Sequence, residues 1–155
     1  MHYVIVGEGP DRDRFEALTR DLGLTGDVTF TGRVPDADLN GYYTLANAVV
    51  MPSEEVAGEP VEGFGLTYLE AGCCGTPAIG TWLGGIPEAV DHGVTGLLVP
   101  PRNPGALAKA IVRLLQDTEM AARMGRMAQE RARSLYRWDL VARRVDTAFQ
   151  ELRDG

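Results

Sequence analysis

Residues 62–71 read EGFGLTYLEA, so two glutamates stand eight positions apart and a Gly-Phe-Gly turn follows the first. We expect Glu62 to lie in a loop and a helix to begin at Leu66, because glycines favour turns and a run of helical pattern follows them. This helix is expected to end at Cys74, since Gly75 comes next and glycine is typical of helix ends. The segment therefore predicts a loop, a glycine turn and a helix.

This layout suits a ligand that carries a phosphate. The first N–H groups of a helix have no internal partner and lie at the positive end of its dipole, and Gly63 and Gly65 let a ligand approach the backbone. Helical side chains lean toward the N-terminus, so Glu70 can reach back toward the same ligand. An ionised carboxylate only accepts hydrogen bonds, and it therefore fits a diol better than the phosphate. The segment favours a sugar–pyrophosphate–ribose ligand; the alternative is two solvated glutamates beside a structural turn.

Strands and helices alternate along the chain. Apolar runs predict strands at residues 3–6, 28–31, 48–51, 77–80 and 95–99. Helical spacing predicts helices after a capping Asp11, around Tyr42, over residues 66–74, and as three C-terminal helices within about 103–152. We expect the last of these, an amphipathic helix, to pack on the domain. The alternation predicts one α/β domain over residues 1–155, with a Rossmann-like parallel sheet and flanking helices.

Ligands of such sheets bind outside the carboxyl ends of the strands. The segments that follow strands are residues 7–9, residues 32–34, Ser53 with its loop, and residues 80–85, which lead into a glycine turn at 84–87. The helix that begins at Leu66 starts at the same edge. This convergence favours a ligand site over a chance spacing of two glutamates.

Composition argues against several classes of protein. The net charge of −7 argues against nucleic acid as a partner, because phosphate backbones need surfaces rich in Lys and Arg. Cys73 and Cys74 are adjacent, and we expect them to be small buried side chains in a reducing, cytoplasmic compartment. No apolar run approaches the ~20 residues of a transmembrane segment. No His, Cys and Asp have ligand spacing, so no metal site is expected.

The first glycine turn, Gly7-Glu8-Gly9-Pro10-Asp11-Arg12, leaves alternatives open. It departs from the G-x-G-x-x-G fingerprint because Arg12 stands at the last glycine position, which disfavours a nicotinamide or flavin cofactor. A turn that contacts a ligand through its backbone and a purely structural turn both remain. Arg33 follows the second strand and could stack on a base or meet a phosphate, whereas a surface arginine is the alternative.

The motifs also occur in a familiar order. In this order they are Val4-Ile5-Val6-Gly7-Glu8-Gly9-Pro10, Val28-Thr29-Phe30-Thr31-Gly32, Pro52-Ser53, Glu62-Gly63-Phe64-Gly65-Leu66 with Leu69-Glu70-Ala71, Gly75-Thr76-Pro77, Gly84-Gly85-Ile86-Pro87-Glu88 and Gly93-Val94-Thr95-Gly96-Leu97-Leu98-Val99. Over nearly the whole chain this order resembles the nucleotide-binding C-terminal half of retaining GT-B glycosyltransferases of the family-four type. The loop between Ser53 and Glu62, together with Val61-Glu62-Gly63-Phe64-Gly65-Leu66-Thr67-Tyr68-Leu69-Glu70, makes the chain look most similar to GDP-mannose-dependent lipid mannosyltransferases.

The resemblance implies transfer of a hexosyl group from a nucleoside-diphosphate sugar with retention of configuration. Glu62 then acts at the donor sugar as the catalytic residue, and Glu70 binds the ribose hydroxyls. The other residues that the resemblance places at the donor are Gly7, Gly9, Arg33, Val34, Ser53, Gly63, Phe64, Gly65 and Leu66. No cofactor and no metal is implied, because the helix N-terminus and basic residues stabilise the leaving diphosphate.

The resemblance also implies parts that lie outside this chain. These are an N-terminal domain that binds the acceptor glycan or lipid, and a first strand and helix whose Arg and Lys clamp the diphosphate. In the family that strand lies between the strands that correspond to residues 3–6 and 48–51. Exposed sheet edges then predict self-association or a partner chain.

We therefore expect a donor-binding half that transfers nothing alone, from a cytoplasmic enzyme that can be peripheral at the membrane. A non-catalytic nucleotide-sugar-binding or complementing module is the alternative from a different class. A dinucleotide-dependent oxidoreductase is disfavoured by Arg12.

Overall fold

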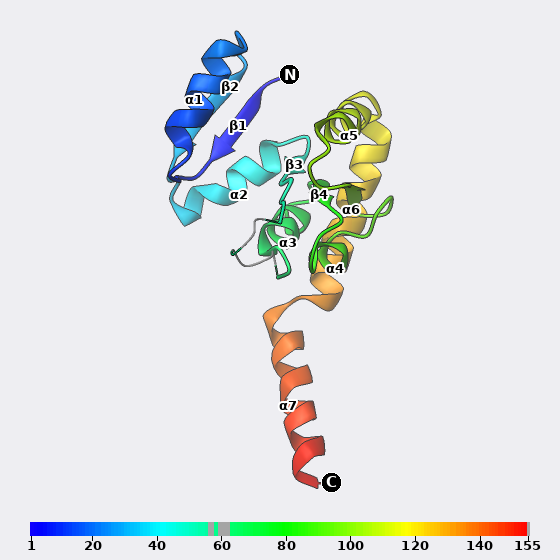
Figure 1. The fold of residues 1–155 in the computed structure, drawn as a ribbon. Coiled ribbons are helices and arrows are strands. Elements are labelled where there is room, and N and C mark those ends of the chain that lie inside the picture. Colours follow the sequence, from blue (N-terminus) through cyan, green and yellow to red (C-terminus); the bar gives the residue numbers. More distant parts are fainter. Residues whose placement is uncertain (56–57, 59–62, 155) are drawn as a thin grey trace. The chain divides into compact units, whose positions relative to one another are not determined.

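A computed structural model describes residues 1–55, 58 and 63–154 (Figure 1). Its internal contacts divide the chain into two compact units, Met1–Leu39 and Asn40–Gly155. Within the described residues, no helix is both long enough and apolar enough to cross a membrane.

The first unit is a parallel strand–helix–strand element. Strand β1 (Tyr3–Val6) pairs in parallel with β2 (Val28–Gly32), and α1 (Arg12–Asp21) connects them. A parallel pair needs such a crossover, because a tight turn can only join antiparallel strands. Asp11 precedes α1, but its side chain makes no capping hydrogen bond, so the predicted side-chain cap is wrong. Helix α2 (Asp36–Leu45) follows and ends in the second unit.

The second unit holds a three-stranded parallel sheet. Its strands are β3 (Val49–Val50), β4 (Ala78–Thr81) and β5 (Gly96–Val99), in that order across the sheet. Its other helices are α3 (Leu66–Cys73), α4 (Ile86–Ala89), α5 (Pro104–Gln116), α6 (Thr118–Leu135) and α7 (Trp138–Asp154). Both sheets are parallel and both alternate with helices, which confirms the predicted α/β fold.

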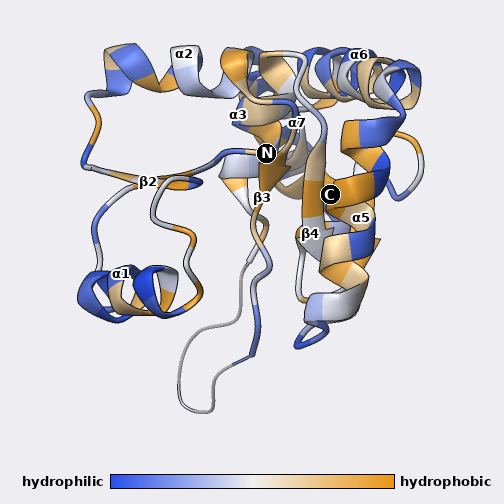
Figure 2. Cartoon of the chain, turned by 90° about the horizontal axis from the view of Figure 1, so that it is seen from above, coloured by the Kyte–Doolittle hydropathy of each residue, from blue (hydrophilic) through white to orange (hydrophobic). Residues whose placement is uncertain are grey.

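The core of the second unit covers both faces of β4 and β5, all of whose residues are buried. On one face, buried residues of α5 and α6 join the strands, namely Ile79, Leu97, Val99, Ala110, Leu114, Met120 and Met124. On the other, α3 and α4 contribute to a second cluster, Tyr68, Ala78, Ile86, Ala89, Val90 and Leu98. Figure 2 shows that α5 carries both hydrophobic and hydrophilic residues, as expected of a helix that packs with one face on the core. Strands buried on both faces read as continuous apolar runs, which explains the sequence GLLV of β5.

Several predicted details are wrong. The glycine turn at 84–87 continues into α4, whose first turn accepts Pro87 because the missing N–H of proline has no helical partner there. Cys73 is exposed and Cys74 half-buried rather than both buried, since adjacent helical residues point in different directions. Leu140 and Val141 in the first turn of α7 are half-buried, but the later apolar side chains are not covered, with Phe149 at 68% exposure, so the predicted packing of this helix on the domain is wrong beyond its first turn.

Each sheet ends in a strand with one pairing partner among the described residues. β1 pairs with β2 alone, and β3 pairs with β4 alone. The expectation of a further strand beside each of them stays a prediction.

Candidate functional site

The turn before α3 is fixed by glycine at two places. Gly65 precedes the helix in the left-handed region at φ 82°, and a Cβ there would also collide with the Tyr68 ring. Tyr68 is buried, its backbone N–H donates to the Gly65 carbonyl over 3.0 Å, and its hydroxyl donates to the Met51 carbonyl over 2.8 Å. A Cβ on Gly85 would collide with the Gly63 carbonyl, so the two backbones lie in contact. The turn is therefore tied to β3 and to the start of α4.

Glu70 on α3 is held by a buried tyrosine. The Tyr43 hydroxyl donates to Glu70 Oε2 over 2.7 Å, and Tyr43 itself is only 8% exposed whereas Glu70 is exposed. Burial, followed by the hydrogen bond and charge of Glu70, raises the pKa of Tyr43 well above its ordinary value of 10.0. The hydroxyl thus stays protonated and keeps donating, which fixes one carboxylate oxygen of Glu70. The other oxygen, Oε1, has no hydrogen bond to a described residue and can accept a bond from a ligand hydroxyl.

The segment after β3 is held by side chains from two other strand ends. Thr81 Oγ1 donates to the Ser53 carbonyl over 2.7 Å. Arg102 lies beyond β5 in the left-handed region at φ 56°, with its Nε 3.1 Å from Glu54 Oε2 and its Nη2 2.6 Å from the Glu55 carbonyl. Ser53 therefore lies, as predicted, at the carboxyl end of β3, in a segment held by one side chain from the end of β4 and one from beyond β5.

The remaining predicted residues of the second unit lie at the same turn. Phe64 is half-buried with its ring centroid 5.3 Å from that of Tyr136, and Leu66 is 59% exposed. Glu62, the predicted catalytic residue, lies outside the described residues. The second unit thus brings Gly63, Phe64, Gly65, Leu66 and Glu70 together, and their roles toward a donor stay predictions.

In the first unit the two predicted glycine segments meet. The Gly7 N–H donates to the Gly32 carbonyl over 2.9 Å, and both residues have positive φ, 123° and 70°. The Gly9 carbonyl accepts from the Arg12 N–H over 3.2 Å and closes the turn into α1. Arg33 is exposed and Val34 half-buried directly after β2, so both stand where the sequence placed them. Their contact with a base stays a prediction.

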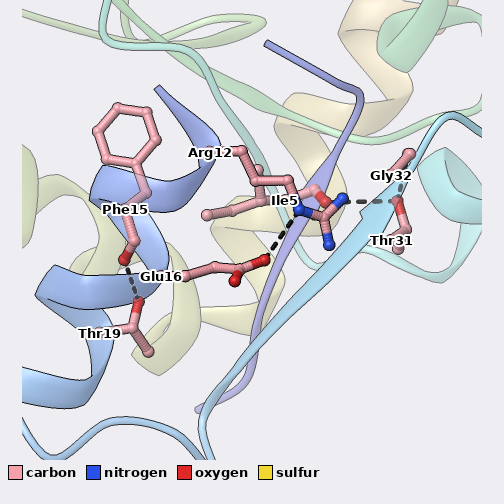
Figure 3. A network of polar contacts seen from close by, with 7 residues as sticks. All are labelled: Ile5, Arg12, Phe15, Glu16, Thr19, Thr31 and Gly32. Carbon is pink, nitrogen blue, oxygen red and sulfur yellow. Dashed lines mark hydrogen bonds and ion pairs between the residues drawn. The ribbon is translucent and has the colours of Figure 1, made fainter. Parts of the chain in front are cut away.

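Arg12 fills the place that a dinucleotide fingerprint leaves to glycine. Figure 3 shows its side chain reaching toward Glu16, whose Oε1 lies 2.8 Å from the Arg12 Nε. The guanidinium also lies 6.0 Å from the centroid of the Phe30 ring, and a Cβ added to Gly32 would stand 3.2 Å from its Nη1. The arginine is thus engaged over the end of β2. This arrangement does not favour a nicotinamide or flavin site.

Sequence reasoning missed two residues of this site. Tyr43 falls in the helix predicted around Tyr42 and Tyr136 falls among the predicted C-terminal helices, but neither was predicted to belong to the site. Buried tyrosines usually find a partner for the hydroxyl, so a tyrosine in an apolar stripe is the signal that could have marked Tyr43. Within the described part of the chain, no three His, Cys, Asp or Glu side chains gather as metal ligands would.

Curated relatives of the chain are glycosyltransferases. The family described as "Glycosyl transferases group 1" matches residues 1–131. The GDP-mannose-dependent alpha-(1-6)-phosphatidylinositol monomannoside mannosyltransferase of Mycobacterium tuberculosis is 39% identical over 143 residues, which cover 92% of this chain and 37% of that protein. The D-inositol 3-phosphate glycosyltransferase of Corynebacterium jeikeium is 35% identical over 144 residues, 93% of this chain and 33% of that protein. The chain spans about a third of the length of these relatives.

Solved structures of glycosyltransferases share the fold of this chain. Sucrose-phosphate synthase from Thermosynechococcus elongatus superposes with a TM-score of 0.84 at 37% identity, over 96% of this chain and 38% of that one. HepE of Anabaena, solved in complex with UDP, gives a TM-score of 0.82 at 28% identity, over 97% and 41% of the two chains. The C-terminal domain of LpcC, a group 1 family protein of Francisella tularensis, gives 0.76 at 25% identity, over 88% and 70%. This chain is therefore a member of the group 1 glycosyltransferases, and it matches the C-terminal half of their GT-B fold.

Proposed function

We propose that this chain is the donor-binding half of a retaining glycosyltransferase that moves a hexosyl group from a nucleoside-diphosphate sugar to an acceptor. The observation that carries the proposal is the pairing of Tyr43 with Glu70 behind the turn that opens α3. One oxygen of the Glu70 carboxylate is fixed by the tyrosine, and its exposed side chain can accept from the ribose hydroxyls. The turn at Gly65 presents the N-terminus of α3 to the diphosphate.

The proposed chemistry needs only positioning and charge stabilisation from this half. The N–H groups at the start of α3 stabilise the negative charge that develops on the leaving diphosphate. Glu62 binds the donor sugar and aligns it. The bond from the sugar to the diphosphate breaks, the acceptor hydroxyl bonds to the sugar on the face that the diphosphate leaves, and its proton passes to the departing phosphate oxygen, so configuration is retained. No metal or cofactor takes part in this proposal.

The donor we favour is GDP-mannose. The support is the 39% identity to a mycobacterial mannosyltransferase whose name specifies GDP-mannose. HepE, at 28% identity, was solved with UDP, so UDP-sugars are the competing donors. In the complete protein an N-terminal domain binds the acceptor glycan or lipid. The enzyme works in the cytoplasm, at the membrane surface when the acceptor is a lipid.

A binding panel tests the proposal. The purified chain is titrated with GDP, UDP, ADP and their sugars, with affinity measured by calorimetry and stability by thermal shift. At a hundred times its Kd a ligand stabilises by about 2.7 kcal/mol, which raises Tm by roughly 5–10 °C in a chain of this size. We expect GDP and GDP-mannose to give the largest shifts.

Three variants assign the glutamates. Glu70→Ala is expected to weaken every nucleotide, because it removes the ribose acceptor. Glu62→Ala is expected to abolish the preference for a nucleotide-sugar over the free nucleotide. Glu119→Ala, an exposed glutamate at the start of α6, is the matched control and should bind like the parent. If all three bind every ligand like the parent, the site assignment is wrong.

We further propose that the chain binds the donor but transfers no sugar alone. The chain spans about a third of its relatives, and in this proposal the acceptor side of the site belongs to the remainder. Sugar transfer by the purified 155-residue chain would overturn this part. A non-catalytic or complementing module is the second possibility, and the reading frame upstream distinguishes the two, because an acceptor domain in frame marks a longer enzyme.

A further inference from the structure

The junction between α6 and α7 is packed against the turn that opens α3. Tyr136 lies between these two helices, 72 positions beyond Phe64 in the sequence. The two rings are tilted by 57° with their centroids 5.3 Å apart, a geometry typical of favourable aromatic pairs. The contact therefore joins the α6–α7 junction to Phe64, the residue between Gly63 and Gly65.

Tyr136 is itself held in place from a third element. Its hydroxyl donates to the Glu88 carbonyl of α4 over 3.0 Å, and Arg131 Nη2 donates to the same carbonyl over 2.9 Å. The Arg131 guanidinium also lies 5.8 Å from the centroid of the Tyr136 ring, where a cation is attracted to the ring face. Both the hydroxyl and the ring of Tyr136 are thus fixed by contacts within the protein.

These contacts close a circuit around the turn. Gly63 contacts Gly85 at the start of α4, α4 offers its Glu88 carbonyl to Tyr136, and the Tyr136 ring packs on Phe64. Phe64 is therefore held in two ways: the preceding residue, Gly63, contacts Gly85, and the Phe64 ring packs on the Tyr136 ring. Removal of the Tyr136 ring would leave the Phe64 ring without its aromatic partner and would let the turn at residues 63–65 relax. Tyr136 can act in this way without touching a ligand.

We propose that Tyr136 is a positioning residue for the donor diphosphate, acting through Phe64 on the N–H groups at the start of α3. The proposal rests on the proposed function, because it takes the diphosphate as the group bound at this turn. It also makes the α6–α7 junction a place from which donor affinity can be altered, since a displacement of Tyr136 acts on the turn directly.

The first test separates positioning from general loss of structure. Affinities for GMP, GDP, UMP and UDP are measured for the parent, Tyr136→Leu and Tyr136→Phe, and the gain from the second phosphate is taken as the ratio of monophosphate to diphosphate Kd. An aromatic pair converts to a factor of about 2–12, so Tyr136→Leu should lower this ratio by that factor. Tyr136→Phe keeps the ring on Phe64 but loses the bond to Glu88, so its ratio should lie between those of the parent and Tyr136→Leu.

Two controls define the outcome. Trp138→Leu removes an 81% exposed aromatic two positions further on and should leave the ratio unchanged. Glu70→Ala should weaken mono- and diphosphates equally, which identifies a ribose contact. An equal loss for both nucleotides in Tyr136→Leu, or the same change in Trp138→Leu, would overturn the positioning role.

A second measurement needs no ligand. Hydrogen exchange of the Tyr68 amide reports on the turn, because this amide donates to the Gly65 carbonyl. Tyr136→Leu should speed its exchange by about 2–12-fold, from the same aromatic pair, while the amides of α5 keep the parent rate. Parent-like exchange at Tyr68 would refute the proposal. If the parent binds no nucleotide, the proposed function fails and this exchange still decides whether Tyr136 fixes the turn.

Discussion

The Tyr43–Glu70 hydrogen bond makes a prediction with a sign that changes with pH. Tyr43→Phe removes the hydroxyl and keeps the ring of a residue that is only 8% exposed. Hydrogen bonds to charged groups contribute roughly 1.5–3 kcal/mol, and water replaces part of this because Glu70 is exposed, so we expect a loss of about 1 kcal/mol at pH 7. In a chain of this size that lowers Tm by roughly 2–4 °C.

At alkaline pH the parent should lose this advantage. The folded protein keeps the Tyr43 proton because its pKa is raised, whereas the unfolded chain releases it near the ordinary value of 10.0. A raised folded pKa contributes stability that is present below the unfolded value and lost as pH rises toward the folded one. One pH unit above 10 costs the parent about 1.4 kcal/mol, a cost that the phenylalanine variant does not have. The two proteins should therefore be equally stable somewhat below pH 11, and at pH 11 the variant should be more stable by about 0.4 kcal/mol.

Urea denaturation from pH 7 to 11 measures both effects. Tyr42→Phe, on the same helix with a 37% exposed side chain, is the control and should change the free energy of unfolding at pH 7 by less than about 0.5 kcal/mol. Nucleotide affinity gives an independent readout, because a freed Glu70 must be ordered on binding at a cost of about 0.5–1.5 kcal/mol, or roughly 2–12-fold in Kd. A gap between parent and Tyr43→Phe that stays constant up to pH 11 would refute the assigned hydrogen bond and its effect on the tyrosine.

Three further predictions concern the backbone. Gly65→Ala should lower the free energy of unfolding by at least about 1–2 kcal/mol because of the left-handed backbone, and further because the Tyr68 ring must move. Gly58→Ala is the control, since Gly58 also has positive φ but a Cβ there would meet no atom. A larger loss for Gly58→Ala than for Gly65→Ala in urea denaturation would contradict the prediction. Arg102→Gly should be more stable than Arg102→Ala by about 1 kcal/mol, because both lose the contact with Glu54 but only glycine relieves φ 56°; equal Tm values would count against it. We also expect concentration-dependent self-association through the open edges of β1 and β3, and a constant mass in sedimentation at all concentrations would exclude it.

The sequence predicted those features whose signals are local. The parallel α/β order follows from alternating apolar runs and helical spacing, and the start of α3 follows from Gly65, a residue that both the backbone and the Tyr68 ring require. The partners of the site could not be predicted in this way. Tyr43 is 27 positions from Glu70, and periodicity says which side of a helix is apolar without saying what it meets. The exposed face of α7 shows the same limit, because an amphipathic pattern predicts a covered face without naming the cover.

Backbone carbonyls accept many of the hydrogen bonds that hold the second unit together. Tyr68 donates to the carbonyl of Met51, Thr81 to that of Ser53, and Tyr136 to that of Glu88. Every residue type offers a carbonyl, so the accepting positions can change identity while the bond persists, and only the donating positions are restricted. The side chains of the accepting residues are therefore not needed for these hydrogen bonds. Such an arrangement lets a single scaffold diversify its choice of donor by substitutions that leave its architecture intact.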